Sequence, residues 1–130
     1  MFGWSMRQAR SKENQLDDWL IDRFEFAIQA AGTLVIRPKA GTLDSVGLQQ
    51  VCQRLLKAEG LRLSRIQFDF SMVTELSGSW SILFGLLIRL SREVAPRVSL
   101  TGLRGQPASA AWVYRHSREM RVLLAEPVPA

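Results

Sequence analysis

The chain has few of the residues on which most catalytic and metal sites depend. Its 130 residues include one cysteine and one histidine, His116. A single cysteine excludes an internal disulfide, and a single histidine excludes every metal motif that needs two. The sequence also lacks a glycine-rich phosphate loop of the GxxxxGKS or GxGxxG type. We therefore expect no metal, no cofactor and no enzymatic activity.

Long hydrophobic segments are missing as well. The most apolar run, 82–88, is far too short to cross a bilayer and stops at Arg89. The amino-terminal residues do not follow the basic, apolar and small-residue pattern of a signal peptide. Hydrophobic residues nevertheless make up 47% of the chain, which is enough for one buried core. These features predict a cytoplasmic, single-domain protein.

The excess of basic residues is concentrated in one stretch. The formal net charge is +5, and residues 89–121 carry Arg89, Arg92, Arg97, Arg104, Arg115, Arg118 and Arg121 against Glu93 and Glu119. Such a stretch either keeps helix surfaces solvated or contacts nucleic acid, an anionic membrane or an acidic partner. No aromatic residue alternates with these arginines in a base-stacking pattern, so nucleic acid is the weakest of these hypotheses.

Hydrophobic periodicity predicts an alternation of strands and helices. Residues 24–29 alternate as a strand does, and 33–36 return as a second strand after a turn at Gly32. Asp44 can cap a helix whose apolar stripe includes Cys52, which we expect to be an inert core thiol. Further strands are expected at 66–71, 98–100 and 122–124, and further helices at 80–94, where Ser77 can act as the cap, and from Pro107 to Met120. The order β-β-α-β-α-β-α-(β) predicts an α/β domain with a mixed sheet.

The two ends of the chain differ from its middle. Residues 1–23 form a leader in which 16–23 have the spacing of a short amphipathic helix. The leader either covers one edge of the domain or docks to a partner or a membrane surface. The domain itself is expected to span 24–126, and the proline-containing residues 127–130 form a tail.

Four short motifs, in this order, resemble the STAS family, the sulfate transporter and anti-sigma factor antagonist domain. They are Gly41-Thr42-Leu43-Asp44 before the first helix, 66–73 on the third strand, the helix after Ser77, and 98–102 on the fourth strand. The resemblance covers 24–126 and implies a STAS-like mixed sheet with helices on one face. It also implies that the loop before the second helix docks onto a protein partner.

The sequence departs from the family at its phosphorylation motif, D-S-x-G. An ungapped comparison from Val73 places Gly78 where the family has the phosphorylated serine. Ser77 and Ser79 stand beside it and are the candidate phosphoacceptors, because a helix N-terminus stabilises a phosphate. Alternatively, Ser77 is simply the helix cap and Ser79 lies in the first turn.

The resemblance implies a partner-binding surface on two neighbouring loops. Trp80 is either an interface anchor or a core residue under the loop. Asp69, at the end of the third strand, is expected to hydrogen-bond the following loop rather than to act as a catalytic group. The predicted partner-binding residues are Gly41, Leu43, Asp44, Val73, Leu76, Ser77, Gly78, Ser79 and Trp80.

Two functions follow from this surface. The first is a non-enzymatic regulator that resembles an anti-sigma factor antagonist, binds an anti-sigma factor with serine kinase activity, and has a lost or relocated phosphoswitch. The alternative is a cytoplasmic STAS accessory subunit of a lipid-type ABC transporter, which would contact the membrane only through its partner complex. A kinase assay on Ser77 and Ser79 distinguishes the two.

Overall fold

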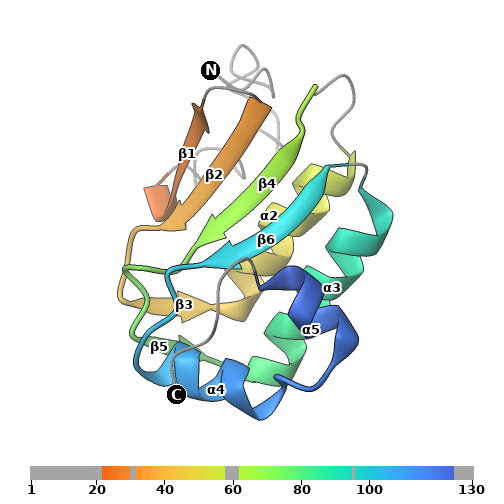
Figure 1. The fold of residues 1–130 in the computed structure, drawn as a ribbon. Coiled ribbons are helices and arrows are strands. Elements are labelled where there is room, and N and C mark those ends of the chain that lie inside the picture. Colours follow the sequence, from red (N-terminus) through yellow and green to blue (C-terminus); the bar gives the residue numbers. More distant parts are fainter. Residues whose placement is uncertain (1–21, 30–31, 58–61, 95, 125–130) are drawn as a thin grey trace.

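The computed structural model describes residues 22–29, 32–57, 62–94 and 96–124. The fold is a mixed α/β arrangement in which helices cover one face of a four-stranded sheet (Figure 1). Apart from Asp22 and Arg23, the predicted leader lies outside the described residues, and so does the tail. Within the described part, no helix is long and apolar enough to cross a membrane.

The four-stranded sheet has the strand order β1-β2-β4-β6. Its first pair is an antiparallel hairpin, and Gly32 between the two strands has φ +75°, a conformation that favours glycine. The other pairs are parallel, as strands joined by helical crossovers must be. The strands are β1 (Phe24–Gln29), β2 (Thr33–Pro38), β4 (Arg65–Asp69) and β6 (Arg97–Thr101).

Burial alternates clearly along β4, where Ile66 and Phe68 are buried, whereas β2 and β6 also bury Val35 and Ser99 on the opposite face. Ile36, Phe68 and Leu100 are in register on neighbouring strands and are fully buried. The helices α2 (Ser45–Lys57) and α3 (Trp80–Glu93) cover this face (Figure 1). The apolar stripe predicted for the first helix is confirmed, although Leu56 at its end is 36% exposed. Cys52 is buried on this stripe, and burial raises its pKa to about 12, so it is the inert thiol that was expected.

The carboxyl-terminal region differs from the prediction of one helix followed by a strand. It contains two short helices, α4 (Gln106–Val113) and α5 (Arg118–Leu123). The Ser117 hydroxyl accepts a hydrogen bond from the Met120 amide at 3.3 Å and starts α5, because a serine cap satisfies a free helix amide. Met120 and Leu123 then share the buried side of α5, so a strand at 122–124 was wrong. Leu124 alone pairs with Leu100, through a single parallel bridge.

Two short strands were not predicted. They are β3 (Thr42–Asp44) immediately before α2, and β5 (Glu75–Ser77) shortly before α3. The two strands pair with each other and form a separate two-stranded sheet below the large one (Figure 1). This small sheet positions the candidate site.

Candidate docking site

The small sheet brings together the two loops in which the sequence predicts a binding surface. The strands β3 and β5 run parallel, with Thr42 opposite Glu75, Leu43 opposite Leu76, and Asp44 opposite Ser77. The expectation that the Ser77 loop lies beside the Leu43 turn is therefore confirmed. We call residues 41–46 and 72–82 the docking corner.

Side chains and backbone groups both hold the two loops together. The amides of Thr74 and Glu75 donate to the Gly41 carbonyl at 2.7 and 3.2 Å, and the Thr42 hydroxyl donates to the Glu75 carboxylate at 2.8 Å. The Leu76 amide donates to the Gln106 side-chain oxygen at 3.0 Å, which ties the start of α4 to β5. Because most of these groups are exposed, each bond contributes only about 1 kcal/mol or less.

Gly41 is needed for space rather than for an unusual backbone angle. The glycines with positive φ in the described residues are Gly32, Gly78, Gly102 and Gly105, so Gly41 has an ordinary backbone angle. A Cβ atom at Gly41 would lie 3.2 Å from the Thr74 hydroxyl oxygen, which itself donates to the Gly41 carbonyl. A larger side chain would therefore push the two loops apart.

Both helices of the corner begin with a side-chain cap. Asp44 accepts a hydrogen bond from the Val46 amide at 2.9 Å, as predicted. The cap of α3 is Ser79, which accepts from the Ile82 amide at 3.5 Å and is hydrogen-bonded to the Ser81 hydroxyl at 2.8 Å. The expectation that Ser77 caps this helix is wrong, because Ser77 is used as the last residue of β5.

Gly78 cannot be replaced by a serine without a local shift. Its φ is +125°, which residues with a Cβ atom rarely adopt. A Cβ atom there would lie 2.8 Å from the hydroxyl oxygen of Ser45, the first residue of α2. The backbone at position 78 is therefore shaped for glycine in this chain.

Some of the predicted binding residues support the corner from inside. Leu43 is 3% exposed and Val73 is fully buried, so neither offers a surface to a partner. Trp80 is half-buried, packs against the core, and stacks on Phe84 with ring centroids 5.7 Å apart. Trp80 therefore contributes to the core while part of its side chain stays accessible, and its role as an interface anchor stays a prediction.

The corner carries exposed apolar side chains that the sequence reasoning missed. Val46, Met72 and Ile82 are 55%, 51% and 60% exposed. Val46 and Ile82 lie in the first turns of α2 and α3, off the buried stripe of each helix. The sequence does contain a signal for these two residues, because each is an apolar residue on the polar side of an amphipathic helix, and such residues often mark a contact surface.

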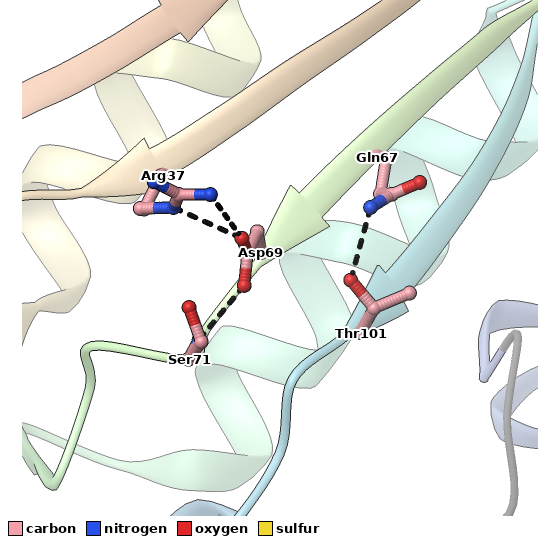
Figure 2. Close-up of polar contacts among 5 residues, drawn as sticks. All are labelled: Arg37, Gln67, Asp69, Ser71 and Thr101. Carbon is pink, nitrogen blue, oxygen red and sulfur yellow. Dashed lines mark hydrogen bonds and ion pairs between the residues drawn. The ribbon is translucent and has the colours of Figure 1, made fainter.

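A polar cluster on the uncovered face of the sheet fixes the loop that leads to β5. Figure 2 shows Arg37 and Ser71 directed at the Asp69 carboxylate. The Nη2 and Nε atoms of Arg37 lie 2.8 and 2.9 Å from Oδ2 of Asp69, and the Ser71 amide donates to Oδ1 of Asp69 at 2.9 Å. Burial tends to raise the pKa of Asp69, but the Ser71 and Arg37 contacts outweigh it and lower the pKa below its usual value. The predicted loop-holding role of Asp69 is confirmed, and nearby Gln67 donates to the Thr101 hydroxyl at 3.2 Å.

A pocket lies next to the corner, on its β1 side. It has a volume of about 440 Å³. Its lining includes Arg23, Pro38, Lys39, Leu43 and Asp44. Charged groups of both signs face it, and Asp44 is already used to cap α2.

The described residues contain no group of three or more metal-ligating side chains. His116 is exposed in the turn between α4 and α5. The docking corner itself consists of two loops, two helix starts and exposed apolar side chains.

Taken together, a mixed sheet covered by helices on one face and two adjoining loops at its edge define a STAS-type fold. A solved structure described as "Structure of the Anti-Sigma Factor Antagonist SpoIIAA in its Unphosphorylated Form" is similar to this chain, with a TM-score of 0.55 and 23% identity. The similarity covers 72% of this chain and 83% of that one. No protein-family model matches the sequence, and no curated protein matches it.

Proposed function

We propose that the chain is a non-enzymatic STAS-domain regulator that binds a protein partner through the docking corner. The resemblance to anti-sigma factor antagonists suggests an anti-sigma factor with serine kinase activity as that partner. The observation that carries the proposal is the parallel pairing of β3 with β5, which brings the starts of α2 and α3 to one surface. Exposed apolar residues on that surface favour protein contact.

The geometry supports a phosphorylation switch that is lost at Gly78 and relocated to Ser77. Ser79 is half-buried and its hydroxyl is occupied by the cap of α3. Ser77 is exposed and has no side-chain hydrogen bond within the described residues. A phosphate on Ser77 would lie opposite Asp44, whose carboxylate caps α2, so two negative groups would face each other. Phosphorylation would then disturb the docking corner without unfolding the domain.

Site-specific photocrosslinking in the native host tests the proposal. A crosslinking residue replaces Ile82 in the corner, and a matched variant carries it at Gln53, an exposed residue in the last part of α2. We expect an adduct with a kinase-type anti-sigma factor from the Ile82 variant and none from the Gln53 variant. Adducts from Gln53 alone would contradict the docking corner. An ATPase subunit of a membrane transporter as the Ile82 adduct would replace the first function with the alternative.

Treatment with the captured kinase then tests the relocated switch. We expect phosphate on the wild-type chain and on Ser79→Ala, and none on Ser77→Ala. Equal labelling of the Ser77→Ala variant would show that Ser77 is not the acceptor.

A further inference from the structure

The end of the molecule opposite the docking corner is strongly basic. The parallel strands β4 and β6 begin there, and the helices α2 and α3 end there (Figure 1). Arg65 and Arg97 are the first residues of β4 and β6 and lie directly opposite each other in register. Lys57, in the last turn of α2, and Arg62, shortly before β4, lie at the same end. We call Lys57, Arg62, Arg65 and Arg97 the basic pole.

These four cations have no acidic partner among the described residues, whereas some basic groups elsewhere, such as Arg37, Arg89 and Arg92, do. Arg37 pairs with Asp69, and Arg92 pairs with Glu119 across α3 and α5. The ion pairs that the structure holds do not include the basic pole. Like charges placed opposite each other on neighbouring strands disfavour the fold. Lys57 is favoured by the C-terminal end of the helix dipole, but Arg65 and Arg97 gain nothing from a helix. An anion bound across them would remove this repulsion.

Two exposed aliphatic side chains accompany the charges. Ile28, near the end of the edge strand β1, is 53% exposed, and Leu56, beside Lys57, is 36% exposed. Both residues lie toward the end at which β2 and β4 begin, because β1 is antiparallel to β2 and α2 runs toward β4. None of the residues at this pole that the structure describes is aromatic, which disfavours stacking on nucleic acid bases. Cations beside aliphatic groups are the combination that suits an anionic lipid headgroup region.

The geometry points to the basic pole as a peripheral contact for an anionic membrane surface. The chain would rest on the headgroups with the amino ends of β4 and β6. The docking corner, at the carboxyl ends of the same strands, would then face away from the lipid and stay open to a partner. This contact does not depend on the proposed function, because the two surfaces share no residue.

Vesicle co-sedimentation of the full chain tests this proposal. Phosphatidylcholine vesicles with and without phosphatidylglycerol are compared, using wild type and the double variant Arg65→Gln/Arg97→Gln. The matched control, Lys39→Gln/Arg104→Gln, removes the same charge from exposed residues at the opposite end. We expect binding only to the anionic vesicles, and an affinity about 30-fold lower for the first double variant, from about 1 kcal/mol per basic residue at a lipid surface. The control should change affinity less than twofold.

Two results would overturn the membrane contact. An equal loss of binding in both double variants would mean that net charge alone attracts the chain. The second result is that wild type binds an oligonucleotide but no vesicles, and that only Arg65→Gln/Arg97→Gln abolishes this binding. That result would assign the basic pole to nucleic acid. If Arg65→Gln/Arg97→Gln lowers the melting temperature, Lys57→Gln/Arg62→Gln repeats the experiment outside the sheet.

Discussion

The large sheet and the small sheet are built on different principles. In the large sheet, the strands β2, β4 and β6 bury side chains such as Ile36 and Phe68 completely under two helices. In the small sheet, Leu43 alone of the strand residues is buried, and exposed hydrogen bonds supply much of the remaining cohesion. Apolar burial contributes far more per residue than an exposed hydrogen bond does.

This difference separates stability from binding. Local opening should occur first where buried apolar contacts are few, and binding loops are drawn from such regions. The small sheet, which brings the starts of α2 and α3 together, can therefore adjust to a partner, while the large sheet and the helices packed on it supply the stability of the fold. Substitutions in the two sheets should give effects of different size and kind.

The largest effect is expected for Phe68→Ala, in the centre of the large sheet. Phe68 is fully buried between Ile36 and Leu100, so truncation leaves a cavity under α2 and α3. We expect a loss of about 3–5 kcal/mol in the free energy of unfolding, measured by urea denaturation. The exposed Met72→Ala serves as control and should lose less than about 0.5 kcal/mol. Equal losses would remove the distinction between the two sheets.

The next effect concerns Asp69, which links the large sheet to the loop before β5. Asp69→Ala removes the Arg37 ion pair and the acceptor for the Ser71 amide, and should cost about 2 kcal/mol at neutral pH. Folding lowers the pKa of Asp69, so its contribution is present above the usual carboxyl pKa and disappears as the pH falls below it. The difference in unfolding free energy between wild type and Asp69→Ala should therefore shrink between neutral pH and strongly acidic pH. A difference that does not change with pH would show that the ionised carboxylate is not the stabilising form.

The sequence predicts the large sheet well because its signals are local and periodic. Alternation at 24–29 predicts the strand β1, of which Phe24 is buried although Ile28 is exposed, and the stripe through Leu48, Val51 and Cys52 is buried as expected. The order of the elements followed from the same local signals, and the resemblance to the STAS family implied helices on one face of a mixed sheet, with which the structure agrees.

The small sheet could not be predicted in the same way. Strands of three residues, Thr42–Asp44 and Glu75–Ser77, are too short for any period to appear. Their pairing depends on contacts between loops that are far apart in the sequence, such as Thr42 with Glu75. The cap of α3 was assigned to Ser77 instead of Ser79 because both serines satisfy the same local rule, and only the pairing of Ser77 with Asp44 distinguishes them. The single helix predicted for the carboxyl-terminal region is divided into α4 and α5 because Ser117 caps a new helix. The sequence offers several polar residues there that could act as caps, so it does not show which one is used.

The smallest effects are expected at two exposed glycines that differ in backbone conformation and in their surroundings. Gly78→Ala forces a Cβ atom into a φ of +125° and against Ser45, but the exposed loop can relax. We expect a loss of about 1 kcal/mol in the free energy of unfolding, together with weaker partner binding, because the loop must shift at the docking corner.

Gly85→Ala should act in the opposite direction. Gly85 is exposed in the middle of α3, and a Cβ atom there would meet nothing within 4 Å. Alanine restricts the unfolded chain and suits a helix, so the unfolding free energy should rise by up to about 1 kcal/mol. Both changes add a single methyl group to an exposed glycine, and thermal denaturation of the two variants in parallel compares them directly. A stabilised Gly78→Ala would show that the loop before α3 is free to adopt an ordinary backbone conformation, in which case the exclusion of serine from position 78 would have no conformational basis.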